Sequence, residues 1–165
     1  MINTVRLDAG WENIYKKDEV RDGTFTALDG TKKTVPMMYS EEHSYLDDGK
    51  ATGFIKPYKN GYSFVALLPN EGVSLDDYAA SMTGKSYIDT IKNAKDVPVE
   101  TIIPKFSYDY DIEMSGALKA LGMPLPFDAE KADFSALGSS GNGNIFISRV
   151  LHKAYIAVDE KGTKA

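Results

Sequence analysis

Short alternations of apolar and polar residues, separated by turn sequences, fill the first two-thirds of the chain. The turn sequences are Asp29-Gly30, Asp48-Gly49 and Asn60-Gly61. They suit hairpins, because both residue types tolerate the positive φ of a tight turn. The alternations predict strands at Ile2–Leu7, Thr24–Leu28, Thr34–Leu46, Thr52–Ile55 and Tyr62–Leu68. The last of these is apolar on both faces, so we expect it to be buried on both.

Apolar residues then recur at helical spacing in three segments. Ser74 and Asp77 form a capping pattern at the start of the first predicted helix. The second predicted helix covers Ser86–Ala94. The third, Ile112–Leu121, has the most regular apolar face and ends at a glycine, which is a typical helix stop.

The longest strand-like run is Ile145–Val158, which follows the flexible connector Gly138–Asn144. At about 3.3 Å per residue this run could extend about 45 Å. It is apolar on both faces, so we expect it inside a large sheet, beside Ile2–Leu7 or Val99–Tyr108. The whole pattern predicts an α+β fold with antiparallel or mixed sheets and a few short helices. The fold is expected to be incomplete, because the other predicted elements are too few to cover so long a strand.

Composition narrows the function classes. The chain has 165 residues, enough for one domain, and its 42% apolar and 26% charged residues are typical of a globular protein. The net charge of −5 and the lack of a basic stripe argue against a nucleic-acid partner. The sequence has no cysteine, which excludes disulfides and thiolate metal sites within it. No apolar run is long enough to predict a membrane span.

Candidate chemical motifs are each incomplete. Ala79–Ser86 fits a permissive phosphate-loop pattern, but a predicted helix precedes it where a buried strand is needed. Asp109–Glu113 resembles the opening of a calcium loop but lacks its later glycine and glutamate, so acidic residues entering a helix are the simpler interpretation. His43 has no cluster of further ligands, and His152 lies among apolar residues, as a core histidine would. We therefore predict no catalytic residue, no metal, no cofactor and no enzyme activity.

Several segments resemble, in order, the serpin family of serine-protease inhibitors. They are Asn3–Leu7, Trp11-Glu12, Val35–Met38, Pro57-Tyr58, Leu67–Pro69, Ile103–Phe106, Leu118–Met123, Ala132–Ser135, Ile147–Ala154 and Val158–Thr163. The match covers essentially the whole chain, and its last two segments are the most specific. The resemblance implies that residues 1–165 form one partial serpin domain, without the family's N-terminal helices, reactive loop and C-terminal strands.

The resemblance also implies a mechanism. A serpin offers an exposed loop as bait to a serine or cysteine protease, and the loop then inserts as a new strand into the central sheet. By this resemblance Trp11 lies where the sheet opens, and His152 lies in the mid-sheet shutter. The segment equivalent to Ile2–Leu7 flanks the slot that receives the loop.

The reactive-loop hinge is expected at the end of the chain. The resemblance assigns to it Glu160, Gly162, Thr163 and Ala165. Small residues suit a hinge that must enter a packed sheet. Lys164 departs from the family, which usually has an acidic residue there, and its long charged stem could slow insertion or simply face solvent.

The scissile bond would fall after Ala165, so we expect the chain alone to be inactive and the parent to inhibit proteases. The alternative is a non-inhibitory serpin with a carrier, chaperone or storage role, which the residues after the hinge would distinguish. The isolated chain is expected to self-associate through uncovered apolar surface and sheet edges. The resemblance also implies secretion or display at the cell surface. From the charge and the apolar pattern we expect no nucleic-acid and no membrane partner.

Overall fold

The structure is a computed structural model that describes residues 3–165. It divides into two compact units, one formed by Met1–Ser107 with Ala157–Ala165 and the other by Tyr108–Ile156. Ile2 lies outside the described residues. Residues 3–7, the rest of the predicted strand Ile2–Leu7, form no strand, so that prediction is wrong; the strand in this region is Asp8–Gly10.

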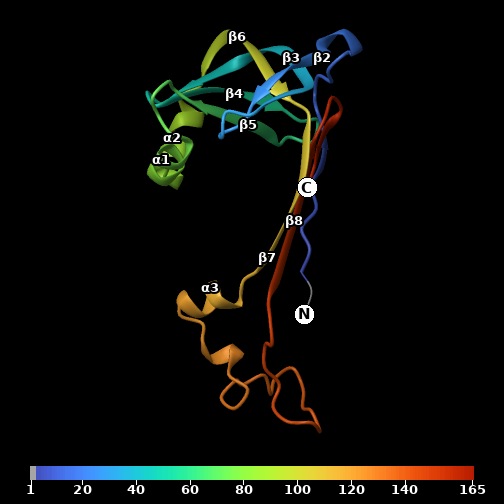
Figure 1. Cartoon of the computed structure of the whole chain (residues 1–165), viewed down its shortest axis with the longest axis vertical. Coiled ribbons are helices and arrows are strands. Elements are labelled where there is room, and N and C mark those ends of the chain that lie inside the picture. The colour runs from blue at the N-terminus through green and yellow to red at the C-terminus, as the bar shows by residue number, and fades with distance from the viewer. Residues whose placement is uncertain (1–2) are drawn as a thin grey trace. The chain divides into compact units, whose positions relative to one another are not determined.

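A five-stranded antiparallel sheet forms most of the first unit (Figure 1). Its strands are β2 (Val20–Thr26), β3 (Lys32–Asp47), β4 (Ala51–Pro57), β5 (Ser63–Pro69) and β6 (Lys95–Pro104). The order is β2-β3-β4-β5, and β6 pairs with β3. The predicted turns are confirmed, since Gly30, Gly49 and Gly61 all have φ between 81° and 84°. Those angles favour glycine and fix the hairpins locally.

Two short helices lie against one end of this sheet. Helix α1 (Leu75–Ser81) begins as predicted, because the Ser74 side chain accepts a hydrogen bond from the backbone N–H of Asp77. Helix α2 (Gly84–Lys92) begins with a reciprocal capping box between Thr83 and Ser86. The glycine, lysine and serine of the phosphate-loop pattern are therefore the first turn of α2. A single 3₁₀ turn, η1 (Lys17–Glu19), precedes β2.

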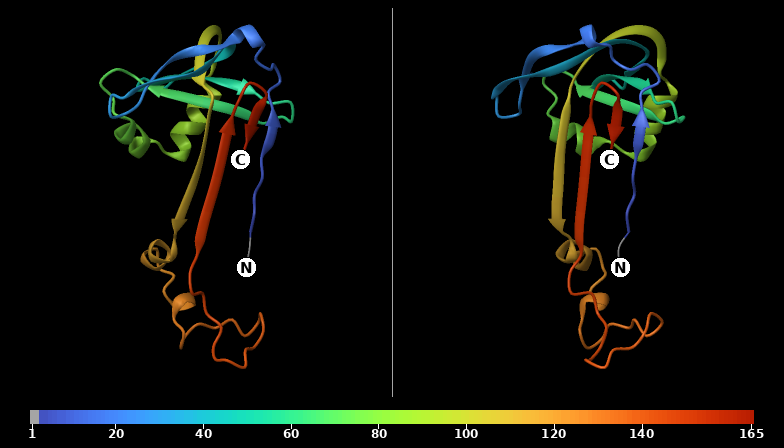
Figure 2. Two further views of the ribbon diagram at one scale, coloured as in Figure 1. Left: turned by 45° about the vertical axis from the view of Figure 1, so that its right-hand side comes forward. Right: turned by 90° about the vertical axis from the view of Figure 1, so that its right-hand side faces the viewer.

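The second sheet has the strand order β1-β9-β8-β7. Its members are β1 (Asp8–Gly10), β9 (Gly162–Lys164), β8 (Leu151–Val158) and β7 (Phe106–Glu113). Within the first unit, β9 pairs antiparallel with β1 on one side and with the end of β8 on the other. Figure 2 shows the short β9 between β1 and β8. The chain thus turns back after β8 and adds its own last residues as a strand.

The second unit contains α3 (Ser115–Ala120), the 3₁₀ turn η2 (Leu125–Phe127) and a long irregular loop. Backbone hydrogen bonds tie this loop to the rest of the unit: the N–H of Met114 donates to the carbonyl of Val150 at 2.8 Å, and that of Ile147 to the carbonyl of Pro126 at 2.8 Å.

Two predictions about where a strand and a helix begin are wrong. The predicted strand Ile145–Val158 begins only at Leu151, and its sheet neighbours are β9 and β7. The predicted helix Ile112–Leu121 begins at Ser115, because the alternation of tyrosine and aspartate before it continues β7 to Glu113. A period of two there competes with the helical period and prevails. The acidic residues 109–113 therefore lie in a strand rather than entering a helix.

Burial also differs from expectation for β5. Its residues are mostly half-buried, and Leu68 is 74% exposed, so the strand is not buried on both faces within this chain. Among residues 3–165, the apolar side chains with at most 1% exposure lie in the first unit: Trp11, Met38, Leu46, Ala51 and Val158. Trp11 and Val158 belong to the β1–β9–β8 region, which makes that region part of the core.

Candidate functional site around Trp11

Trp11 follows β1 directly and is fully buried. Its ring stacks on Tyr58, with centroids 4.5 Å apart and planes only 8° from parallel. Tyr15 and Phe64 meet the same ring edge-on, at 6.3 Å and 5.6 Å. Such aromatic pairs each add about 0.5–1.5 kcal/mol beyond the area that they bury. The rings therefore form a rigid cluster that fastens residues 11–15 to the five-stranded sheet.

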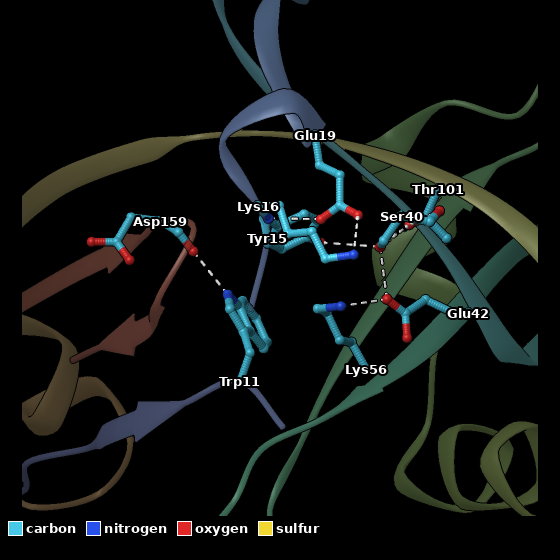
Figure 3. Close-up of polar contacts among 9 residues, drawn as sticks. All are labelled: Trp11, Tyr15, Lys16, Glu19, Ser40, Glu42, Lys56, Thr101 and Asp159. Carbon is cyan, nitrogen blue, oxygen red and sulfur yellow. Dashed lines mark hydrogen bonds and ion pairs between the residues drawn. The ribbon is translucent and has the colours of Figure 1, made fainter. Parts of the chain in front are cut away.

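The turn that connects β8 to β9 is held by residues 11–15. The Trp11 indole N–H donates to the carbonyl of Asp159 at 2.8 Å (Figure 3). The backbone N–H of Tyr15 donates to the carbonyl of Glu160 at 3.1 Å, and that of Trp11 to the carbonyl of Lys161 at 2.9 Å. Three successive carbonyls of the turn are thus satisfied by two residues. The Asp159 carboxylate closes the turn from within by accepting from the N–H groups of Lys161 and Gly162.

Strand β9 requires close packing against β1. Gly162 lies opposite Gly10, and a Cβ atom at Gly162 would lie 2.1 Å from the carbonyl oxygen of Ala9. Only glycine fits at that separation. The next residue, Thr163, is buried, and its hydroxyl accepts a hydrogen bond from the Tyr58 hydroxyl at 2.5 Å. Burial raises the pKa of Tyr58, so the phenol remains a donor over the ordinary pH range.

Glu160 connects the turn to Lys105, the residue that directly follows β6 of the five-stranded sheet. Its carboxylate lies 2.5 Å from the Lys105 ammonium, which follows β6, and both side chains are about one-third exposed. The Lys105 ammonium beside it holds the pKa of the Glu160 carboxyl below its usual range. The Glu160 carboxyl is therefore ionised at neutral pH. The end of the chain is fixed by two further bonds, since the backbones of Leu7 and Ala165 donate to each other at 2.7 Å and 2.9 Å.

The predicted hinge residues and Trp11 meet at this site, but His152 does not. His152 lies in the part of β8 that belongs to the second unit, and its side chain is exposed. The expectation of a core histidine is therefore wrong for this chain, because here β8 lacks a cover over that residue. The sequence pattern indicates no role for Tyr15, Tyr58 or Lys105. Most of their contacts join residues distant in sequence, and only Tyr58 and Lys105 lie in segments that resemble the family.

Other candidate chemistry does not assemble at a site. Among residues 3–165, no three His, Asp or Glu side chains come together in a way that could hold a metal ion. Within the same residues, no helix has the length and apolar character needed to cross a membrane. The Glu113 carboxylate, from the calcium-like motif, accepts hydrogen bonds from Ser115 at the start of α3.

Comparison with known proteins gives a consistent result. The family model described as serpin (serine protease inhibitor) matches residues 1–165. Leukocyte elastase inhibitor A from Rattus norvegicus is 30% identical over 175 residues, which cover 100% of this chain and 46% of the rat protein. Serpin-Z2B from Triticum aestivum is 32% identical over 172 residues, covering 99% of this chain and 43% of the wheat protein.

Solved structures agree with these relatives. The thermophilic serpin tengpin in its native state has a TM-score of 0.85 and 50% identity, covering 96% of this chain and 41% of tengpin. Thyroxine-binding globulin, complexed with thyroxine-fluorescein, has a TM-score of 0.85 and 25% identity, covering 96% of this chain and 47% of that protein. The chain thus spans a little under half the length of the proteins that it matches.

Proposed function

This chain belongs to the serpin family, and we propose that it is the part of a protease inhibitor that receives the start of the reactive loop. The observation that carries the proposal is the position of β9. Residues Gly162–Lys164 form a strand between β1 and β8, so the segment that follows β8 already pairs as an inserted strand would. Each added residue gains backbone hydrogen bonds and burial, which is the driving force that strand insertion needs.

Insertion gives a physical route to inhibition. Serpins are protease inhibitors and not enzymes, and in our proposal a serine or cysteine protease attacks the loop beyond Ala165. The loop then continues the path that β9 begins, between β1 and β8. Lys164 does not oppose this path, because its side chain is exposed while Gly162 and Thr163 are buried. This chain would be one part of the domain that carries out insertion, because it spans less than half the length of these relatives.

The proposal is tested with the longer protein and with this chain in parallel. Mixed with trypsin-like, chymotrypsin-like, elastase-like and papain-like proteases, a parent extending past Ala165 is expected to form a covalent complex that survives detergent electrophoresis. The 165-residue chain is expected to form none. A complex with the chain alone, or none with the parent and any of these proteases, would contradict the proposal.

A carrier role is the second candidate, and the similarity to thyroxine-binding globulin favours it. The residues that follow Ala165 distinguish the two. A run of small residues suits insertion, whereas bulky residues or proline would resist it. Secretion or display at the cell surface stays a prediction from the family resemblance.

Self-association of this chain is a further expected result. Leu68 on β5 and Ile102 on β6 are 74% and 57% exposed, and β5 lies at the end of its sheet order. Covering a few hundred Å² of apolar surface at about 25 cal/mol per Å² contributes several kcal/mol, enough to favour a dimer. Sedimentation velocity at micromolar concentration measures this directly. A monodisperse monomer would contradict it.

A further inference from the structure

A buried ion pair lies directly beneath the Trp11 site. Lys56 on β4 and Glu42 on β3 meet at 2.5 Å, and their side chains are only 4% and 9% exposed. The Ser40 hydroxyl donates to the same carboxylate oxygen at 2.7 Å and lies 2.9 Å from the Thr101 hydroxyl (Figure 3). A buried ion pair is weak support for stability, because apolar residues of similar volume often stabilise a fold equally well. Its presence suggests a positional role.

The lysine end of the pair faces the aromatic cluster. The Lys56 ammonium lies 4.5 Å from the ring centroid of Tyr15 and 5.7 Å from that of Trp11. Both distances fall within the range of a cation–π attraction, which strengthens where water is excluded. Tyr15 and Trp11 are almost completely buried, so water is excluded here. Lys56 therefore holds both rings against the five-stranded sheet.

The same two residues hold the turn at the hinge. Trp11 donates to the carbonyls of Asp159 and Lys161, and Tyr15 donates to the carbonyl of Glu160. Contacts thus run without a gap from Glu42 to Lys56, to the two rings, and to the turn that leads into β9. All of these residues belong to the first compact unit.

We propose that the Glu42–Lys56 ion pair is a positioning element for the hinge. The pair sets how firmly the turn at residues 159–161 and strand β9 stay docked in the sheet. This inference rests on the proposed function, because a hinge matters only if the loop inserts. If it is correct, the pair tunes how readily the first inserted residues are captured and released.

The test compares two neutralised pairs. In the first variant Lys56→Met and Glu42→Gln remove both charges at nearly constant volume and leave no buried charge alone. The matched control is Lys85→Met with Asp89→Asn. That pair has the same 2.5 Å separation, but its side chains are 85% and 49% exposed and it lies on α2, away from the rings.

Amide hydrogen exchange of the whole chain is the main readout. In the first variant the amides of Trp11, Tyr15 and Ala165 are expected to exchange at least about tenfold faster than in the control variant. The amides of the β2–β3 ladder should be unchanged. Trp11 is the only tryptophan of the chain, so its fluorescence should also become more accessible to acrylamide.

Two outcomes would overturn the inference: unchanged exchange at those three amides, or equal acceleration throughout the first unit, which would mean a purely structural role. If the neutral pair does not fold, Tyr15→Leu removes the ring and leaves Lys56 paired. That variant should also accelerate exchange at Trp11 and Ala165, and no acceleration would again overturn the proposal. The experiment contains no protease, so its result is independent of whether the parent forms a covalent complex.

Discussion

Trp11→Ala is expected to lower the free energy of unfolding of the first unit by about 3–5 kcal/mol, the usual range for removing a large buried aromatic side chain. The substitution removes the stacking on Tyr58 and opens a cavity where the side chain is fully buried. It also removes the donor to the carbonyl of Asp159. The turn into β9 should therefore loosen together with the core.

Trp11→Phe is the matched control. It keeps a flat ring for the stack but cannot donate to Asp159, so its cost is expected to be clearly smaller, with the lost hydrogen bond contributing about 0.5–1.5 kcal/mol. Urea unfolding followed by far-UV circular dichroism measures both, because either substitution removes the only tryptophan fluorophore. A loss below about 1 kcal/mol for Trp11→Ala would show that the ring cluster does not support this unit.

Gly162→Ala is expected to undock β9 from β1. The new Cβ would lie 2.1 Å from the carbonyl oxygen of Ala9 and 2.8 Å from the Cα of Gly10. Both are backbone atoms of one strand, so no side-chain rotation relieves the clash. The amide of Ala165, just beyond β9, donates to the carbonyl of Leu7. The hydrogen-exchange rate of this amide should rise by at least about tenfold. If the proposed function is correct, a parent that extends past Ala165 and carries this substitution should be cleaved by the protease without forming the covalent complex.

Gly84→Ala provides the comparison for this substitution. Gly84 is the first residue of α2, and a Cβ there would meet no atom within 4 Å. Alanine in a helix is favourable by up to about 1 kcal/mol relative to glycine, so exchange at Ala165 should not change and the chain should be no less stable. Equal exchange at Ala165 in the two variants would contradict the packing argument for Gly162.

Local signals in the sequence were sufficient for the hairpins and the first helices. The positive φ at Gly30 and Gly61 is a property of two adjacent residues, and the Ser74 cap needs only the next turn of chain. The resemblance to the family rested on other short segments of the sequence, found in the same order as in the family. It assigned Trp11 to the opening of the sheet and the end of the chain to the hinge, as separate predictions. The structure shows that Trp11 contacts the turn at residues 159–161, and the hinge role itself stays a prediction.

The lengths of β8 and α3 were not determined locally. Residues 145–150 have a strand-like composition but no strand beside them, so β8 begins at Leu151. Tyr108–Glu113 fits both a strand and the approach to a helix, and pairing in the sheet selected the strand. A pattern gives the period of a segment, whereas its length depends on where a partner strand is available.

Sequence by itself determined the family, the hairpin turns and the Ser74 cap, because each is encoded within short stretches of neighbouring positions. Only the tertiary structure decided that Gly162 must be glycine, that Lys105 pairs with Glu160, and that Lys56 lies buried between Glu42 and two aromatic rings. These contacts join residues that are 14 or more positions apart in the sequence, such as Lys56 with Glu42 and Gly162 with Gly10. No local period records such pairs, since their separation is set by how the strands stack and turn.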